Sequence, residues 1–201
     1  MKHIIFDFDG VIIDSFKFHI KKMNEIYNRD LTEEEYSNRH TGNFYENPSE
    51  KFEGIDYSDY AKKVSEDQSN LTPNPDSIEL LKELSTKFHL HIITSGWKVQ
   101  VMPFFEKHNI VNLFDNFLLA EDGKKKSDKF NILFKKGISS EDCIFVTDTL
   151  GDLYESNHVG VKTIAVDFGY HSAELLKKGE PNYIVSSFNE MRPIFDSFIK
   201  S

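Results

Sequence analysis

Only one cysteine, Cys143, occurs among the 201 residues of the sequence. A single thiol excludes a disulfide within the chain and is typical of a protein that works in a reducing compartment. No apolar run approaches the roughly 20 residues that are needed to cross a membrane. The apolar N-terminus also reaches a carboxylate, Asp7, before it attains the length of about 7–15 residues typical of a secretory signal. These absences predict a cytoplasmic protein.

Positive charge is also scarce, since 24 lysines and arginines stand against 33 aspartates and glutamates, a net charge of -9. An acidic surface repels phosphate backbones and anionic lipids, so we expect no binding to nucleic acid or to a membrane. The same polar surface favours a monomer or a weak homodimer. By contrast, 18 phenylalanines indicate a substantial core. A chain of this length buries roughly 70% of its unfolded surface and needs no disulfide or structural metal to fold.

Short apolar runs alternate with amphipathic segments along most of the chain. The runs predict strands at residues 4–8, 90–94, 117–119, 143–146, 163–166 and 183–185. The segments predict helices at residues 16–27, 77–88, 99–108, 127–136, 151–158 and 172–178. Asp76 and Ser127 stand at positions typical of helix N-caps. The alternation indicates an α/β fold, with a parallel sheet that is covered by helices on both sides.

One part of the chain departs from this rhythm. Residues 31–70 are rich in Glu, Asp, Ser, Asn and Tyr and poor in aliphatic side chains, and the sequence LTPNP then interrupts the chain at residues 71–75. We interpret residues 15–74 as a helical insertion. Residues 1–14 and 75–201 then form the core domain.

Polar side chains follow several of the predicted strands. Asp7 and Asp9 follow the first strand, Thr94 and Ser95 the second, and Asp148 the fourth. Ligands of open parallel sheets bind beyond the carboxyl ends of the strands, so these side chains are expected to meet. Carboxylates that are buried together are costly unless a cation accompanies them. Oxygen ligands of this kind suit Mg²⁺.

Four short motifs resemble, in the same order, those of the haloacid dehalogenase (HAD) superfamily. The sequence DFDGV at residues 7–11 resembles the first motif and Thr94 the second. Lys126 resembles the third, and DTLGD at residues 148–152 the fourth. The insertion at residues 15–74 lies where this family carries its helical C1-type cap. The resemblance implies a Rossmann-like three-layer core with a parallel sheet and a small inserted helical cap.

The resemblance also implies a role for each acid of the first motif. Asp7 would be the nucleophile that forms an aspartyl-phosphate. Asp9 would protonate the leaving oxygen and later accept a proton from the attacking water. We expect burial and neighbouring acids to raise the pKa of Asp9, as the first of these steps requires. An acid at this position favours phosphatase or phosphomutase chemistry over dehalogenation.

The remaining motif residues are assigned by the same resemblance. Thr94 would bind a phosphoryl oxygen, with Ser95 as the alternative. One lysine of the run 124–126 would contact the phosphate and Asp7, and Lys126 fits that position best. The implied ligands of Mg²⁺ are Asp7, the main-chain carbonyl of Asp9, Asp148 and, through water, Asp152.

The cap carries three further candidates for substrate contacts. His19 lies on the first predicted cap helix, and Arg39 and His40 precede an irregular stretch that suits a specificity loop. Each has a structural alternative, because a histidine is often hydrogen-bonded within a core and an exposed arginine is often merely solvated.

The sequence therefore predicts a Mg²⁺-dependent phosphomonoester hydrolase that forms an aspartyl-phosphate. Its small cap leaves a narrow cleft and suits a small soluble phosphorylated metabolite, over which the cap would close and exclude bulk water. Two alternatives remain open at this point. One is a phosphomutase similar to β-phosphoglucomutase, and the other is a binding protein on a catalytically silent scaffold.

Overall fold

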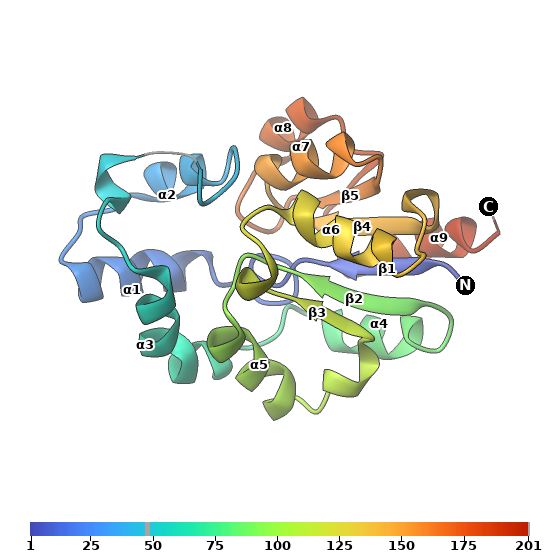
Figure 1. Cartoon of the computed structure of the whole chain (residues 1–201), viewed down its shortest axis with the longest axis horizontal. Helices are drawn as coiled ribbons and strands as arrows, with labels where there is room; N and C mark the ends of the chain where they lie inside the picture. Colours follow the sequence, from blue (N-terminus) through green and yellow to red (C-terminus); the bar gives the residue numbers. More distant parts are fainter. Residues whose placement is uncertain (47–48, 201) are drawn as a thin grey trace.

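The computed structural model describes residues 1–46 and 49–200. Within these residues, six strands form one parallel sheet in the order β3-β2-β1-β4-β5-β6 (Figure 1). The strands are β1 His3–Phe6, β2 His89–Ile93, β3 Asn116–Leu118, β4 Cys143–Thr147, β5 Lys162–Val166 and β6 Tyr183–Val185. Every neighbouring pair is parallel, which confirms the predicted α/β class.

Helices cover both faces of the sheet, which confirms the predicted three-layer core. One face is covered by α4 (Ser77–Leu84), α5 (Lys98–Lys107) and α9 (Phe188–Phe198). The other face is covered by α6 (Lys126–Lys135), α7 (Leu150–His158) and α8 (Ala173–Leu176). Successive strand residues point to opposite faces, so Phe6 packs in the first of these layers and Ile5 in the second. Short 3₁₀ turns are η1 Glu50–Phe52, η2 Val111–Leu113, η3 Ala120–Asp122, η4 Ser140–Asp142 and η5 Lys177–Gly179.

Asp76 occupies the predicted N-cap position of α4 but lacks the predicted capping bond, and the prediction that Ser127 caps α6 is wrong. Asp76 adopts a left-handed backbone conformation with φ of 62°, and its side chain makes no capping bond to α4. Its Oδ2 instead accepts a hydrogen bond of 3.1 Å from Asn189 of α9. Helix α6 begins one residue before Ser127, whose main-chain N–H donates to Glu155 Oε2 at 3.0 Å. A carboxylate on a neighbouring helix therefore serves the N-terminus of α6 in place of a local cap.

Helix α9 is absent from the sequence-based prediction, which ended at the strand of residues 183–185. Ser187 caps this helix by accepting a hydrogen bond from the N–H of Glu190. Pro193 lies inside it and weakens the helical signal. The buried face of the helix consists of Phe188, Met191, Phe195 and Phe198.

The inserted segment forms a small helical cap at one end of the sheet (Figure 1). Its helices are α1 Phe16–Tyr27, α2 Glu33–Arg39 and α3 Tyr57–Ser69. They enclose an apolar cluster separate from the core, which Tyr170 of the core joins. The two connections to the core lie side by side, because Ile13 and Pro73 form a β-bridge and Asn74 N–H donates to Ile12 O at 2.8 Å. These features support our proposal that residues 15–74 form one inserted unit.

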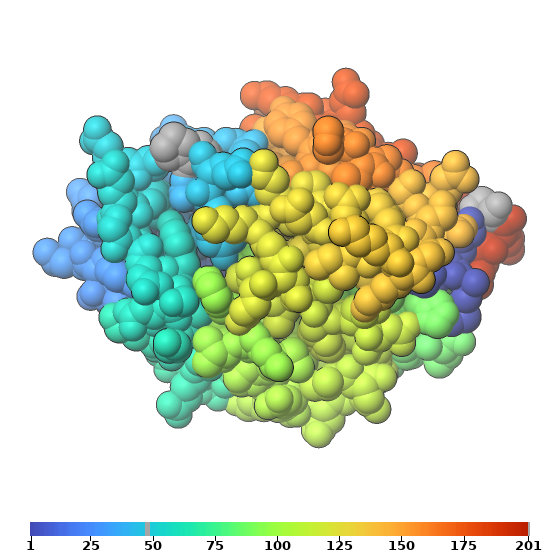
Figure 2. Space-filling view, in the orientation of Figure 1, coloured from blue at the N-terminus to red at the C-terminus, as the bar shows by residue number. Residues whose placement is uncertain are grey.

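The cap is seated directly on the core. The N–H of Gly151, in the first turn of α7, donates to the carbonyl of His40 at 3.0 Å. The N–H of Leu150 donates to His171 Nδ1 at 2.9 Å, so the opposite nitrogen of that ring donates to Ser37 O of the cap at 3.0 Å. Figure 2 shows the blue and cyan cap in contact with the yellow part of the core. The cap therefore lies against the strand ends of the core in this structure.

In residues 1–46 and 49–200, every helix is too short or too polar to span a lipid bilayer.

Candidate active site

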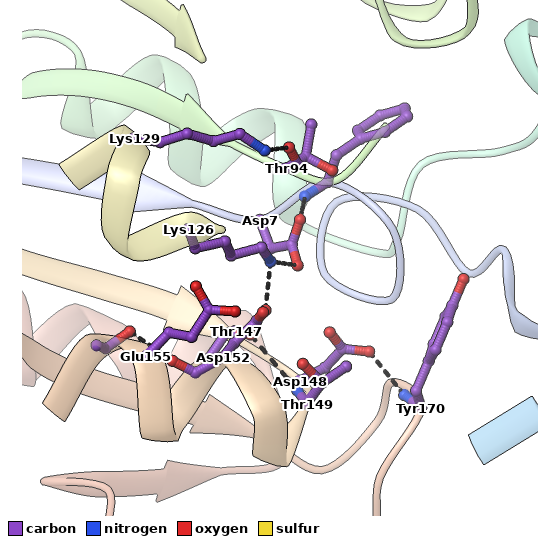
Figure 3. A network of polar contacts seen from close by, with 12 residues as sticks. Asp7, Thr94, Lys126, Lys129, Thr147, Asp148, Thr149, Asp152, Glu155 and Tyr170 are labelled. Atoms are coloured by element: carbon purple, nitrogen blue, oxygen red, sulfur yellow. Dashed lines mark hydrogen bonds and ion pairs between the residues drawn. The ribbon is translucent and has the colours of Figure 1, made fainter. Parts of the chain in front are cut away.

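Asp7 directly follows β1 and lies within a buried polar network (Figure 3). Its Oδ1 accepts a hydrogen bond of 2.7 Å from the N–H of Phe8, and its Oδ2 accepts one from the ammonium of Lys126. The main-chain N–H of Asp7 donates to Val146 O of β4 at 2.9 Å. Strands β1 and β4 lie where the strand order reverses, which is where open α/β sheets bind their ligands. The fold therefore sets Asp7 at the expected binding edge.

Lys126, in the first turn of α6, lies between two carboxylates and donates to both Asp7 and Asp152. Burial lowers the pKa of Lys126, but Asp152 and Asp7 outweigh burial and raise the pKa above its usual range. The amine is therefore held as a charged ammonium. Thr147 Oγ1 also donates to Asp152, at 2.6 Å, and fixes that carboxylate against the end of β4.

The three lysines of the run 124–126 occupy different environments. Lys126 is buried, whereas Lys124 is exposed. Lys125 pairs with Glu46 of the cap at 3.0 Å. Among the three, Lys126 is the one that contacts Asp7.

Asp148 follows β4 and is fully buried. Its Oδ2 accepts a hydrogen bond of 2.7 Å from the N–H of Tyr170. Its Oδ1 is buried and has no hydrogen-bond partner in the part of the chain that the structure describes. Two glycines make room for this carboxylate, because a Cβ on Gly10 or on Gly169 would overlap Asp148 Oδ2.

The carboxyl groups of this network suit a divalent cation. Burial raises the pKa of Asp7, and burial together with the charge of Asp7 raises the pKa of Asp148. Both groups thus need more positive charge than Lys126 supplies to be stable as anions. Among the described residues, no three His, Cys, Asp or Glu side chains are already grouped to hold a metal ion. Mg²⁺ prefers oxygen ligands. Three candidates suit it here: the Asp7 carboxylate, the unpartnered oxygen of Asp148 and the main-chain oxygen of Asp9.

Asp9 is held by three donors on one oxygen. Its Oδ1 accepts hydrogen bonds from Ser15 Oγ at 2.7 Å, from Gln68 Nε2 at 2.9 Å and from His19 Nε2 at 3.1 Å. Burial raises the pKa of Asp9, but His19 and then Ser15 outweigh it, so the pKa lies below its usual range. The expectation of a raised pKa is therefore wrong for this arrangement. These donors come from the cap and its linker. The closed position of the cap therefore favours the carboxylate form of Asp9.

Thr94 and Ser95 follow β2 on the same edge of the sheet. Thr94 is buried, and its Oγ1 accepts a hydrogen bond of 3.2 Å from the N–H of Gly96. A Cβ on Gly96 would overlap Val101 at 2.6 Å and would lie 3.7 Å from Thr94 Oγ1 and 3.8 Å from Asp9 Oδ2, so this turn packs closely beside both polar atoms. Ser95 uses its carbonyl to accept a hydrogen bond of 2.9 Å from the hydroxyl of Tyr45.

The predicted cap residues lie at different depths. His19 and His40 line the cavity, and His19 also contacts Tyr60 through its second ring nitrogen at 2.8 Å. Arg39 is buried, and its guanidinium lies over the rings of Phe44 and Phe52, each at 5.2 Å. Within the described chain, Arg39 is not one of the residues that line the cavity.

Two buried polar residues near the site were not predicted from the sequence. Lys129 is fully buried and donates to Thr94 O at 2.6 Å, which supports the end of β2. Gln68 bridges the cap and the core, since it donates to Asp9 and accepts a hydrogen bond of 2.5 Å from Gln100 of α5. The available signal was position, because Gln68 continues the buried face of α3 that Tyr60 and Val64 form at the same four-residue spacing. A glutamine on an apolar helix face indicates a specific polar partner.

Comparisons with known proteins give a consistent family. The family model described as "Haloacid dehalogenase-like hydrolase" matches residues 4–166. A phosphoglycolate phosphatase from Salmonella typhi is 24% identical over 142 residues, which are 68% of this chain and 56% of that protein. The chain thus spans little more than half the length of the curated relatives that it matches.

Solved structures share the fold over nearly the whole chain. A predicted phosphatase from Clostridium acetobutylicum has a TM-score of 0.80 at 23% identity, covering 98% of both chains. CbbY from Rhodobacter sphaeroides, solved in complex with phosphate, has a TM-score of 0.76 at 17% identity, covering 96% of both chains. The similarity includes the cap as well as the sheet.

Proposed function

The chain belongs to the haloacid dehalogenase-like hydrolase family, and from this premise we propose that it is a phosphatase for small phosphate monoesters. We further propose that the reaction depends on Mg²⁺ and passes through an aspartyl-phosphate on Asp7. One observation carries the proposal: the carboxylates of Asp7 and Asp9 line one cavity between the cap and the core, and Lys126 is held against Asp7.

The first step is an attack by a carboxylate oxygen of Asp7 on phosphorus. The new bond joins this oxygen to phosphorus, and the bond from phosphorus to the ester oxygen breaks. Lys126 is a fixed cation beside the nucleophile and offsets charge on the phosphoryl oxygens. The hydroxyl of Thr94 lies on the same edge of the sheet and provides a donor to the phosphoryl group.

Asp9 moves the protons of both steps. Asp9 takes up a proton while the cap is open and its cap donors are withdrawn, and it gives this proton to the leaving ester oxygen. It then recovers a proton from the water that attacks the phosphoryl group on Asp7. Its Oδ1 is fixed by Ser15, His19 and Gln68, so Oδ2 is the oxygen available to the reaction. The second step regenerates Asp7 and releases inorganic phosphate.

Mg²⁺ would be held by Asp7, Asp148 and the main-chain oxygen of Asp9, with Asp152 next to them. When bound, the cation would offset the repulsion between the Asp7 carboxylate and the anionic phosphate ester. Asp152 keeps Lys126 in place from the other side. The orphaned Oδ1 of Asp148 is the structural feature that supports this metal site.

The relatives support a phosphate ester as substrate. The relative from Salmonella typhi is a phosphoglycolate phosphatase, and CbbY was solved with phosphate. These relatives support hydrolysis of a phosphate monoester as the reaction. The lining of the cavity bears on which ester is bound.

The test is release of inorganic phosphate from a panel of small phosphate esters, with Mg²⁺ and with EDTA. We expect one released phosphate per ester consumed, and loss of release in EDTA. Asp7→Asn should abolish release, because an amide is a poor nucleophile. Asp196→Asn is the matched control, since Asp196 is exposed on α9 far from the cavity. Isomerisation of a sugar phosphate without phosphate release would contradict a hydrolase and establish a mutase.

A further inference from the structure

The part of the cavity that faces the cap is walled by aromatic rings and carries no cation of its own. We propose that the substrate is a monoester whose leaving group carries an uncharged ring and no second anionic group. This inference rests on the proposed function and adds the substrate class. The cavity is lined by residues of both the cap and the core and is partly open to solvent, so a leaving group beyond the phosphate would lie against the cap.

Three aromatic rings of the cap form one contiguous wall. Phe44 lies edge-to-face with Tyr57 at 4.9 Å between ring centroids and with Tyr45 at 5.3 Å, and Tyr45 and Tyr57 are 5.8 Å apart. All three line the cavity and are partly exposed. The imidazole of His40 stacks on Phe44 at 5.1 Å and extends the wall. His40 and Arg39 pack on Phe44, so the ring surface offered to a ligand belongs mainly to the partly exposed Tyr45 and Tyr57.

The wall is anchored to the core. The hydroxyl of Tyr45 donates to Ser95 O at 2.9 Å, next to the predicted phosphate-binding Thr94. Trp97 lines the same cavity from the core side, at the start of α5. Its side chain also hydrogen-bonds to the side chain of Tyr45, which joins the wall to the core. The rings therefore border the space that adjoins the site of phosphoryl transfer.

The charge of the cavity argues against a second anion. Among the lysines and arginines of the described chain, only Lys126 lines the cavity, and it is bound to two carboxylates. Arg39 is held beneath the wall, between Phe44 and Phe52. The cavity is also lined by five carboxyl groups, those of Asp7, Asp9, Asp148, Asp152 and Glu155.

A leaving group that bears a carboxylate or a second phosphate would therefore meet acids and aromatic faces. Desolvation of an anion without a partner is costly, so such an ester should bind poorly. An uncharged ring instead covers the aromatic faces and excludes water from them.

The test compares esters with similar alkyl leaving oxygens, so that intrinsic reactivity differs little. Benzyl phosphate carries an aromatic ring, glucose 6-phosphate a sugar ring, glycerol 3-phosphate no ring, and 2-phosphoglycolate a second anion. We expect kcat/KM for at least one ring-bearing ester to exceed the values for the other two by about tenfold or more. The better of the two ring-bearing esters identifies whether the ring is aromatic or a sugar. Equal values for all four esters, or a preference for 2-phosphoglycolate, would overturn the inference.

Variants of the aromatic wall test whether its rings cause the preference for ring-bearing esters. Tyr57→Leu keeps apolar contacts but removes a ring, and we expect it to reduce the ratio of kcat/KM between the ring-bearing ester and glycerol 3-phosphate. This ratio does not depend on how much of the variant is folded. Tyr183→Leu is the matched control, because Tyr183 is exposed on β6. An unchanged ratio in Tyr57→Leu contradicts the inference while phosphate release still supports the phosphatase. No release from any ester would instead overturn the proposed function and, with it, this inference.

Discussion

Two glycines decide where the Asp148 carboxylate can lie. Gly10 has a φ of 75°, a conformation that favours glycine, and it follows directly after Asp9. Gly169 has no such backbone requirement, yet a Cβ there would overlap Asp148 and would approach the carbonyl of Gly10 to 2.6 Å. Gly169 is therefore glycine for reasons of space alone, and the space belongs to the proposed metal ligand.

We expect Gly169→Ala to destabilise the protein by about 1–3 kcal/mol, because the added methyl group meets a fully packed carboxylate. The same displacement of Asp148 should raise the Mg²⁺ concentration that gives half-maximal activity. Urea unfolding and a Mg²⁺ titration measure the two effects. Gly42→Ala is the control, since a Cβ at Gly42 meets nothing within 4 Å. Equal behaviour of the two variants would contradict this role of Gly169.

At the scale of single residues, the sequence indicates the motif acids because their position is local. Asp7 and Asp148 directly follow buried strands, and parallel strands bring such residues together whatever the rest of the chain does. Tyr57 and Gln68 give no comparable signal. They reach the site only because α3 folds back over the core, so that their roles depend on tertiary contacts.

At the scale of elements, three histidines link the first residues of β1 and β2. Asn116 Nδ2 donates to His91 Nδ1 at 3.0 Å, so the other nitrogen of His91 donates to His3 Nδ1 at 2.9 Å. Lys136 donates to the oxygen of the Asn116 amide at 2.5 Å and fixes the orientation of the amide. His89 stacks on His3 at 4.9 Å between centroids. This chain of hydrogen bonds requires both His3 and His91 to be neutral.

Burial, and then the proximity of His3, lowers the pKa of His91 to about 4. Burial and His89 also lower the pKa of His3, while Asp115 opposes these effects at both histidines. The unfolded chain takes up these protons near pH 6.5, before the folded chain does. The stability that the neutral pair contributes is therefore fully present above about pH 6.5 and is lost as the pH falls from there toward 4.

We expect the unfolding temperature to fall between pH 7 and pH 5, and His91→Gln to make this fall shallower. Thermal unfolding followed by circular dichroism over this range measures both. His158→Gln serves as the control, because His158 is exposed at the end of α7. If His91→Gln leaves the pH dependence unchanged, another group is responsible for it.

The contact between the cap and α7 depends on a further glycine, Gly151, that lets the two main chains approach closely. A Cβ on Gly151 would overlap the main chain of Gly42, and the carbonyl of His40, two residues earlier, accepts the hydrogen bond of the Gly151 N–H. Alanine suits a helix better than glycine, yet here it would push the cap away from the core.

We expect Gly151→Ala to raise KM by roughly tenfold, since the groups on the cap no longer reach the substrate. Unfolding of the core should change little. Steady-state kinetics and limited proteolysis of the cap test this expectation. An unchanged KM together with unchanged proteolysis would show that the close approach at Gly151 does not control the position of the cap.

The alternation of strands and helices could be predicted from the sequence because it follows from local apolar periodicity. The start of α6 and the whole of α9 could not. Glu155, on a different helix, serves the N-terminus of α6, and Pro193 interrupts the local signal of α9, whose apolar face is stabilised by the core. Such features depend on neighbours that are distant in sequence.

At the scale of the whole molecule, the site is assembled from two units with separate apolar clusters. The core supplies the carboxylates and Lys126 at the point where the strand order reverses. The insertion at residues 15–74 supplies all three donors that hold Asp9, and it also supplies the aromatic wall. Closure of the cap therefore completes both the acid–base site and the space for the leaving group, and each opening would release product.

The most direct test of this account is a search for the covalent intermediate. The protein is mixed with a radiolabelled phosphate ester that it hydrolyses, quenched in acid within one turnover, and digested for peptide mapping. The account predicts label on Asp7 that hydroxylamine removes, the same label in Asp196→Asn, and none in Asp7→Asn. Release of phosphate without any label on Asp7, or label that persists in Asp7→Asn, would contradict the proposed mechanism.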